Sequence, residues 1–184
     1  MNREIVFFHG GGSKEDYEAD QKLVDSLVTK LGPGTAVHYP YLPNDGTPDL
    51  GRRRQIGQEI AKIGDGVILA AHSLGASMLL AYLSENTGEK SISGIFLLAT
   101  PFWDGDEDWV EPFKLLPDFA ARLDTQVPLF FYHCRDDEEV PLAQFDIYKQ
   151  QLPWATFRQL ETGGHQFLHG LGVVAADIRA LQSR

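Results

Sequence analysis

Short apolar runs alternate along the chain with longer segments in which apolar residues recur at helical spacing. The first run, residues 4–8, is typical of a buried strand. The helix that follows carries five apolar residues on one face: Leu23, Val24, Leu27, Val28 and Leu31. The same pattern predicts further strands at residues 35–39, 66–71, 91–99, 127–133 and 155–160. It predicts further helices at residues 51–63, 74–84, 110–122, 141–152 and 171–181.

These strands are apolar on both sides and are separated by helices, which is typical of a parallel sheet with helices on both faces. Right-handed crossovers then predict an α/β fold with a doubly wound, mostly parallel sheet. The chain has 184 residues without a repeat or a linker, so we expect a single domain over residues 1–184. The segment of residues 101–126, between the fourth and fifth strands, is too short to hold a large cap domain.

Composition narrows the partners that the protein could have. The formal net charge is −10, whereas a nucleic-acid partner would require a basic face. The apolar stretches are shorter than the roughly 20 residues that cross a membrane as a helix. Cys134 is the only cysteine, so no internal disulfide can form. We therefore expect a cytoplasmic protein, a monomer or small homo-oligomer, that needs neither nucleic acid nor membrane.

A serine stands between a predicted buried strand and a predicted helix, with a small residue two positions away on each side. This pattern, Ala71-His72-Ser73-Leu74-Gly75, is typical of a nucleophile elbow. The turn is so tight that bulky flanking side chains would collide, and it lifts the Ser73 hydroxyl group above the sheet. A serine that merely caps the helix is the alternative interpretation. We predict that Ser73 is a nucleophile.

A histidine follows the last predicted strand, after a pair of glycines that lets the chain turn sharply. It is His165, in the sequence Gly163-Gly164-His165. An imidazole titrates near neutrality, so it can take a proton from a serine and return it. Loop histidines are commonly just solvated, but the position of this one in a chain with an elbow predicts that His165 is the general base.

The third member of a triad should come from the loop after the preceding strand. Four acidic residues crowd this loop, Asp136, Asp137, Glu138 and Glu139. We predict that Asp137 orients His165, because it lies three residues before Val140, where the chain turns into a helix. Asp136 is the rival. Glu138 and Glu139 are expected to be solvated residues at the helix start.

An oxyanion hole needs two backbone N–H groups that converge on the reacting carbonyl oxygen. We expect one from Leu74, directly after the nucleophile, and the other from the glycine-rich loop that follows the first strand. Gly11 is the predicted donor in that loop and Gly12 the alternative, because glycine lets the backbone approach closely.

Bulky side chains follow the fourth predicted strand and form candidate pocket walls. Phe102 and Trp103 are the predicted substrate-binding residues, with Trp109 and Phe113 nearby. The run of arginines at residues 52–54 is interpreted as a solvated helix face, with an anionic substrate as the alternative. No metal-binding or nucleotide-binding motif is complete, so we expect no metal and no cofactor.

With these motifs the chain resembles the α/β-hydrolase superfamily, and in size the small serine hydrolases grouped with retinoblastoma-binding protein nine and its bacterial relatives. The resemblance rests on His9-Gly10, the elbow around Ser73, Asp137 before Val140-Pro141, and Gly164-His165. It implies a minimal sheet of about six strands and an esterase-like activity. The Leu-x-Cys-x-Glu motif is missing from the chain, so a retinoblastoma-type pocket protein is not an expected partner.

The motifs together predict a serine hydrolase. Such an enzyme forms an acyl-enzyme at Ser73 from a small carboxylic ester or related small-molecule acyl substrate. Two alternatives stay open at this point. The chain could be a catalytically silent binding module that keeps the fold, or a peptidase or amidase with the same triad.

Overall fold

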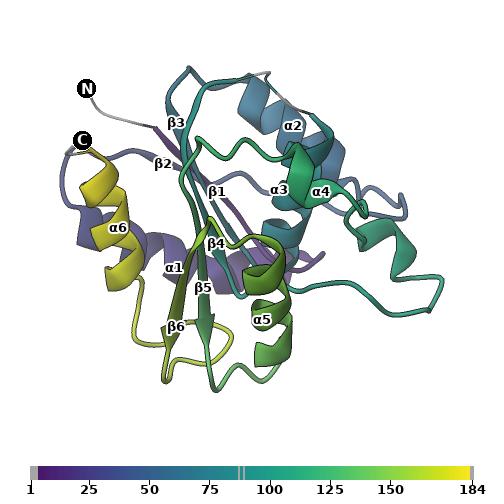
Figure 1. Ribbon diagram of the computed structural model, residues 1–184. Helices are drawn as coiled ribbons and strands as arrows, with labels where there is room; N and C mark the ends of the chain where they lie inside the picture. The colour runs from purple at the N-terminus through teal and green to yellow at the C-terminus, as the bar shows by residue number, and fades with distance from the viewer. Residues whose placement is uncertain (1–3, 87, 89, 183–184) are drawn as a thin grey trace.

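The computed structural model describes residues 4–86, 88 and 90–182, so the ends of the predicted domain at 1–3 and 183–184 lie outside the described residues. Six parallel strands form one sheet in the order β2-β1-β3-β4-β5-β6 (Figure 1). The strands are β1 (Ile5–Phe8), β2 (Val37–His38), β3 (Val67–His72), β4 (Ile92–Leu98), β5 (Leu129–Cys134) and β6 (Thr156–Leu160). The helices are α1 (Lys14–Leu31), α2 (Arg52–Ala61), α3 (Ser73–Glu85), α4 (Phe119–Arg122), α5 (Leu142–Gln151) and α6 (Gly172–Gln182). The predicted doubly wound α/β sheet is confirmed.

Helices cover both faces of this sheet (Figure 1). Successive strand residues point to opposite faces, so Val6 and Phe8 of β1 join one apolar cluster while Ile5 and Phe7 join the other. The first cluster lies under α2, α3, α4 and α5, and the second under α1 and α6. The strands are apolar on both sides because each face meets a layer of helices.

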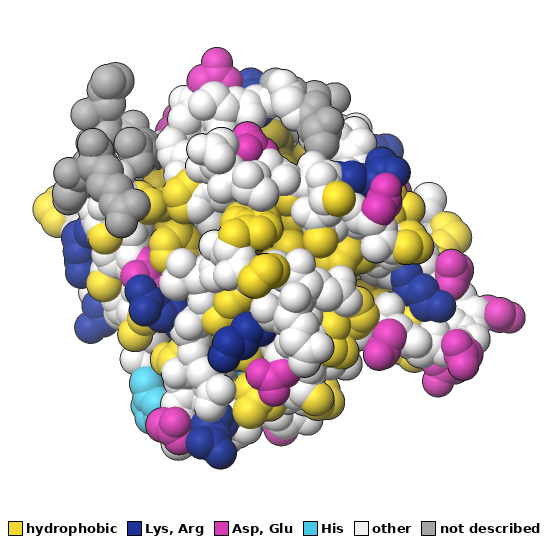
Figure 2. Space-filling view, in the orientation of Figure 1, with side chains coloured by type: hydrophobic (Ala, Val, Ile, Leu, Met, Phe, Trp, Pro, Cys, Tyr) yellow, Lys and Arg dark blue, Asp and Glu magenta, His cyan; other side chains and the backbone are white. Residues whose placement is uncertain are grey.

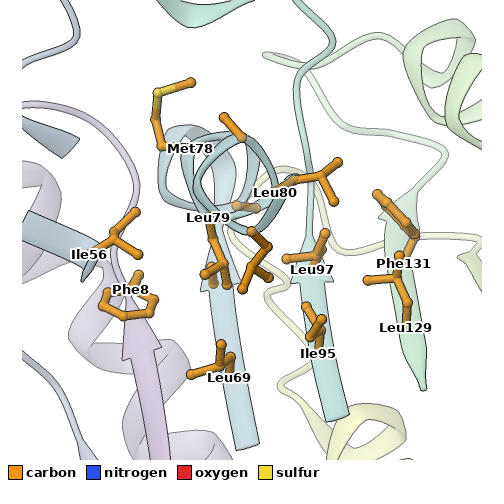
Figure 3. Close-up of a cluster of buried hydrophobic side chains, with 14 of the residues drawn as sticks. Phe8, Ile56, Leu69, Met78, Leu79, Leu80, Ile95, Leu97, Leu129 and Phe131 are labelled. Atoms are coloured by element: carbon orange, nitrogen blue, oxygen red, sulfur yellow. The ribbon is translucent and has the colours of Figure 1, made fainter. Parts of the chain in front are cut away.

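The helix α3 is apolar around nearly its whole circumference and packs at the centre of the sheet. Its residues Leu79 and Leu80 lie above inward-facing side chains of neighbouring strands (Figure 3). Full burial of a leucine side chain stabilises the fold by about 1.5–3 kcal/mol. Because α3 begins at Ser73, this packing fixes the position of the predicted nucleophile.

Three details differ from the sequence-based expectations. Residues 110–122 were expected to form one helix, but they form a 3₁₀ turn (Glu111–Phe113) and the short α4. Proline lacks a backbone N–H and disfavours helix in the residue before it, so Pro112 and Pro117 divide the segment. The strand expected at 35–39 shortens to the two residues of β2. Val28 is 40% exposed, because it lies beside the buried stripe of α1 rather than on it.

All strands are parallel, so their carboxyl ends meet at one edge of the sheet. The order places β1 beside β3 although β2 intervenes in the sequence. Connections leave these two strands in opposite directions, and such a switch point is where α/β sheets bind ligands. The loops after β1, β3, β5 and β6 all reach this edge, and they carry the predicted oxyanion, nucleophile, acid and base residues.

Acidic side chains gather on the segment that links β4 to the 3₁₀ turn (Figure 2). The exposed acidic residues there are Asp104, Asp106, Glu107 and Asp108. Among the described helices, none is both long and apolar enough to cross a membrane.

Candidate active site

The turn from β3 into α3 places Ser73 in a strained backbone conformation with φ of +51°, which a non-glycine residue rarely adopts. Small neighbours make the turn possible. Ala71 is fully buried, and a Cβ atom on Gly75 would lie 2.2 Å from the carbonyl oxygen of His9. The loop after β1 is equally close, since a Cβ atom on Gly10 would lie 2.9 Å from the Ser73 Cβ atom. The local structure therefore has the form of a nucleophile elbow.

The structure brings the three predicted triad residues together. The Nε2 atom of His165 lies 3.0 Å from the Ser73 Oγ atom. The Nδ1 atom of the same ring lies 3.0 and 3.1 Å from the two carboxylate oxygens of Asp137. A carboxylate can only accept, so Nδ1 carries the proton and the lone pair on Nε2 faces the serine hydroxyl group. The ring is therefore oriented as a base toward Ser73.

Asp137 is held by the turn that leads into α5. One of its oxygens accepts the backbone N–H groups of Glu139 at 2.9 Å and Val140 at 2.8 Å. Burial raises the pKa of this carboxyl group, but the hydrogen bonds from His165 and from the two backbone groups outweigh it, so the pKa lies below its usual value. Asp137 is consequently an anion with a fixed orientation.

The neighbouring acidic residues contact the loop after β6, which carries His165, in other ways. Asp136 accepts the backbone N–H groups of Gly163 at 3.2 Å and Gly164 at 2.9 Å, so it binds the loop and not the imidazole. Glu138, expected to be merely solvated, accepts the His165 backbone N–H at 3.1 Å. Glu139 is exposed, yet its carboxylate lies 3.5 Å from the His165 Nε2 atom. Both glutamates are exposed, as expected, but they also contact His165, which the interpretation as a solvated helix start did not include.

The basicity of His165 follows from its surroundings. Burial disfavours the charged ring and lowers its pKa, but the hydrogen bond and charge of Asp137, followed by the charge of Glu139, raise it. The net effect places the pKa of His165 above its usual value. A base of this kind accepts a serine proton readily near neutral pH.

Only one of the three glycine N–H groups in the loop after β1 is left without a partner in the described structure. Asp20 accepts the N–H of Gly10 at 2.8 Å, and Asp16 accepts that of Gly12 at 3.0 Å. The Gly11 N–H is the one that stays available. The N–H of Leu74 lies in the first turn of α3, where a helix offers no internal acceptor. Of the two glycines considered, the geometry favours Gly11.

His9 fixes the peptide plane that contains the Gly11 N–H. Its Nε2 atom accepts the backbone N–H of Leu42 at 3.0 Å, so the proton is on Nδ1, which donates to the Gly10 carbonyl oxygen at 2.7 Å. Burial lowers the pKa of His9 to about 4, which keeps the ring neutral at physiological pH. In a trans peptide the C=O and N–H bonds point in opposite directions, so anchoring Gly10 C=O also aims Gly11 N–H.

Arg52 corrects the expectation of a solvated arginine face. Its side chain is fully buried and donates from Nη2 to the Gly11 carbonyl oxygen at 2.7 Å and from Nη1 to the carbonyl oxygen of Leu42. Arg54 matches the expectation, because it is exposed and forms an ion pair with Asp45, whereas Arg53 is half-buried and forms an ion pair with Glu85. Arg52 therefore supports the glycine loop and does not face an anionic substrate.

A cavity of about 480 Å³ opens beside Ser73. Its aromatic wall consists of Trp103, Trp109 and Phe113, and the Trp103 ring contacts each of the other two. The Trp103 indole N–H donates to the Ser77 hydroxyl group at 3.0 Å, which ties this wall to α3. Phe102, also predicted to line the pocket, packs instead against Tyr148 in the core. Consecutive residues of an extended segment point to opposite sides, so only one of this pair reaches the cavity.

Several buried polar residues of this region escaped the sequence-based prediction: His9, Asp20, Arg52 and His72. Two of them left a signal. Asp20 precedes Leu23, Val24 and Leu27 at helical spacing, so an acidic residue falls on an apolar stripe. His72 ends an otherwise apolar strand, where an unpaired polar side chain would be costly.

The architecture and the site geometry define an α/β hydrolase. A profile described as "Alpha/beta hydrolase family" matches residues 5–183, and the chain belongs to this family. No curated protein matches the chain.

Solved structures of other proteins share the fold across nearly the whole chain. The ydeN gene product of B. subtilis is 17% identical with a TM-score of 0.71, and each chain is covered completely. A serine hydrolase involved in carbazole degradation is 12% identical with a TM-score of 0.73, covering 99% of this chain and 91% of that one. Est1E from Butyrivibrio proteoclasticus is 17% identical with a TM-score of 0.70, covering 98% and 87%. At these identities the likeness establishes the fold.

Proposed function

We propose that this α/β hydrolase is a carboxylesterase-like serine hydrolase that acts on a small carboxylic ester or related acyl substrate. The observation that carries the proposal is the continuous hydrogen-bonded series Ser73–His165–Asp137, with distances of 3.0 Å on both sides of the imidazole. It lies at the open mouth of a cavity. Nucleophile, base and orienting acid are the groups that acyl transfer requires, in the chain order typical of this fold.

In the first half of the reaction the Ser73 Oγ atom attacks the carbonyl carbon and its proton passes to the His165 Nε2 atom. The carbonyl oxygen becomes an oxyanion, which the N–H groups of Gly11 and Leu74 stabilise. Asp137 stabilises the imidazolium that forms and keeps its Nδ1 proton in place. The tetrahedral intermediate then expels the alcohol, which takes the proton from His165, and the acyl group remains on Ser73.

In the second half, water replaces the alcohol. His165 takes a proton from the water molecule as its oxygen attacks the acyl carbon, and the same two N–H groups stabilise the second oxyanion. Collapse of this intermediate releases the carboxylic acid and returns the proton to Ser73. The cycle uses only side chains and backbone groups of this chain, so it needs no added cofactor.

The cavity supports substrates with a short or medium acyl group. Its volume of about 480 Å³ is in the lower part of the range for small-molecule sites, roughly 300–1,000 Å³. The rings of Trp103 and Phe113, with centroids 5.2 Å apart, offer an apolar surface to the acyl chain. No Lys or Arg is among the residues that line this cavity, so an uncharged or cationic substrate fits its electrostatics better than an anionic one.

Covalent labelling with a fluorophosphonate probe tests the proposal. The probe phosphonylates a serine that is activated by a base, so we expect one label per chain at Ser73 and none in Ser73→Ala. Ser77→Ala is the matched control, because Ser77 lies one helical turn further along α3 with its hydroxyl group bonded to the Leu74 carbonyl oxygen. Folded wild-type protein that takes no label would instead favour a silent binding module. Faster turnover of aminoacyl amides than of aryl esters would favour a peptidase.

A further inference from the structure

His72, the residue before the predicted nucleophile, lies fully buried between two oxygen acceptors. Its Nδ1 atom is 2.8 Å from an Asp20 carboxylate oxygen, and its Nε2 atom is 2.9 Å from the backbone carbonyl oxygen of His165. A carbonyl oxygen can only accept, so Nε2 carries a proton. The contact between Nδ1 and the Asp20 carboxylate oxygen is a second hydrogen bond of the same ring.

The surroundings of Asp20 favour its ionised form. Besides His72 it accepts the Gly10 backbone N–H at 2.8 Å and the Gln166 side-chain amide at 3.2 Å. Burial raises the pKa of this carboxyl group, but the charge and hydrogen bond of His72, aided by the other two donors, bring it below the usual value. Asp20 and the His165 carbonyl oxygen thus hold the two ring nitrogens of His72 from opposite sides.

This hydrogen-bonded pair reaches three parts of the candidate site. Asp20 holds Gly10 in the glycine loop after β1, His72 directly precedes Ser73, and its ring holds the backbone of His165. We propose that the buried, hydrogen-bonded His72–Asp20 pair is a positioning unit that keeps the glycine loop, Ser73 and His165 in register. The inference rests on the proposed hydrolase function and concerns residues that do not themselves touch the substrate's reacting atoms.

The hydrogen bonds of the pair support a role beyond stability. Burying polar groups is unfavourable, and apolar replacements of a buried polar pair are often neutral or stabilising. An apolar pair could not accept the Gly10 N–H or donate to the His165 carbonyl oxygen. His72 is 52 positions from Asp20 and 93 positions from His165 in the sequence, so the pair joins distant segments of the chain.

The pair also acts on the charge of His165, because the His72 and His165 rings lie with their centroids 4.7 Å apart. The negative charge of Asp20 contributes to raising the pKa of His165. The other charged or titratable groups that face His165 are Asp137, Glu138, Glu139 and His133. Those that face Asp20 are His9, Asp16 and Tyr39. Removing the Asp20 carboxylate should therefore lower the pKa of His165.

The two single variants Asp20→Asn and His72→Gln test this role. Their kcat values are divided by the fraction of protein in which the fluorophosphonate probe labels Ser73, so that inactive protein is not counted. We expect at least a tenfold loss of kcat in each, with KM changed less than threefold, and no further loss in the double variant, because the pair acts as a unit. The midpoint of the pH–rate profile should fall in Asp20→Asn, because the negative charge of Asp20 contributes to raising the pKa of His165. Asp177→Asn is the control, since this carboxylate binds Tyr132 and Arg158 away from the site.

A kcat within threefold of wild type in both single variants, with unchanged midpoints, overturns the proposal. If the variants fail to fold, ¹⁵N NMR of the histidine rings in the wild-type protein still decides it. We expect the His72 Nε2 atom to carry a proton, because it faces a carbonyl oxygen, and an Nε2 atom without a proton would overturn the link to the His165 backbone. This signal does not depend on activity, so failure of the proposed function, seen as no labelling of wild-type Ser73, remains a separate result.

Discussion

Asp137 binds the Nδ1 atom of His165 with both carboxylate oxygens, at 3.0 and 3.1 Å. Its neighbour Asp136, one residue earlier, accepts hydrogen bonds from the backbone N–H groups of Gly163 and Gly164, in the loop that carries His165. Two adjacent carboxylates thus have different tasks, one on the ring of the base and one on the loop that carries it. The sequence left the choice between them open, and the geometry favours Asp137.

We expect Asp137→Asn to lower kcat by up to ~10⁴-fold, because an amide in that position can favour the imidazole tautomer with its lone pair turned away from Ser73. Asp136→Asn should lower kcat much less, about tenfold or under, since one amide oxygen can still accept a glycine N–H group. The measurement is kcat for both variants on an aryl ester, with circular dichroism to verify folding. A large loss confined to Asp136→Asn would show that Asp136 is the triad acid.

Ser73→Ala should fold and lose ester turnover by at least ~10³-fold, because the covalent route disappears while the oxyanion donors remain. Ser77→Ala offers a comparison within the same helix, and we expect it to keep most of its activity. Steady-state rates on the two variants, purified side by side, make the comparison. Turnover like that of the wild type in Ser73→Ala would contradict the assignment of the nucleophile.

Activity should rise with pH as His165 loses its proton, since only the neutral ring can act as base. Asp137 and Glu139 together raise the pKa of His165 above its usual value despite burial, so the midpoint of kcat/KM should lie above about 6.5. Glu139→Gln removes one anion 3.5 Å from the ring. It should shift the midpoint downward by a few tenths of a unit, and added salt should shrink the difference from wild type. An upward shift would show that Glu139 does not act on the base through its charge.

The central features of this molecule are predictable because each depends on a local pattern. Apolar strands with helical segments between them specify the sheet, and the small residues around Ser73 specify the elbow. The chain order of serine, acidic loop and histidine then predicts a role for Ser73 and His165 and narrows the acid to Asp137 or its neighbour Asp136. Chain order and turn geometry suffice here because the parallel sheet brings all carboxyl-terminal loops to one edge.

The supporting residues could not be predicted in the same way, because their partners are distant in sequence. Arg52 looks like its neighbours in an arginine run, and only the fold places it against the carbonyl oxygen of Gly11, 41 positions away. The residues around Pro112 and Pro117 have helix-like spacing, yet the two prolines override it. The sequence shows Asp20 as an acidic residue on the apolar stripe of its helix. Its partner His72 could not be inferred, because the two residues meet only when α1 packs on the sheet.

The close approach of the glycine loop to α3 leads to a prediction about stability. A Cβ atom on Gly75 would overlap the backbone oxygens of His9 at 2.2 Å and Phe8 at 2.9 Å. Gly75→Ala should lower the free energy of unfolding by about 3 kcal/mol, and so the Tm by roughly 6–12 °C. Gly64→Ala, where an added Cβ meets nothing within 4 Å, should change the Tm by no more than about 2 °C. Equal Tm values for the two variants would mean that the backbone at Phe8 and His9 can move away from the added Cβ atom at little energetic cost.

The side chains of Phe102 and Trp103 point to opposite sides of their segment, so variants of the two residues can separate substrate binding from core packing. Trp103 lines the cavity, whereas Phe102 packs edge-on against Tyr148 with ring centroids 5.2 Å apart. Trp103→Ala should raise KM about tenfold for a hexanoate ester and much less for an acetate ester, because the lost surface contacts the longer acyl chain. Phe102→Ala should instead reduce stability by about 2 kcal/mol, which is below the cost of emptying a fully buried phenylalanine site.

Steady-state kinetics with the two p-nitrophenyl esters, together with thermal unfolding, separates these effects. The ratio of KM values for hexanoate and acetate should change in Trp103→Ala and stay constant in Phe102→Ala. Trp103→Phe keeps an aromatic face but loses the hydrogen bond to Ser77, so it should restore most of the hexanoate affinity if the ring surface is what binds. If the ratio of the two KM values changed only in Phe102→Ala, the acyl chain would bind on the side of the segment that faces α5, and Trp103 would not be a substrate-binding residue.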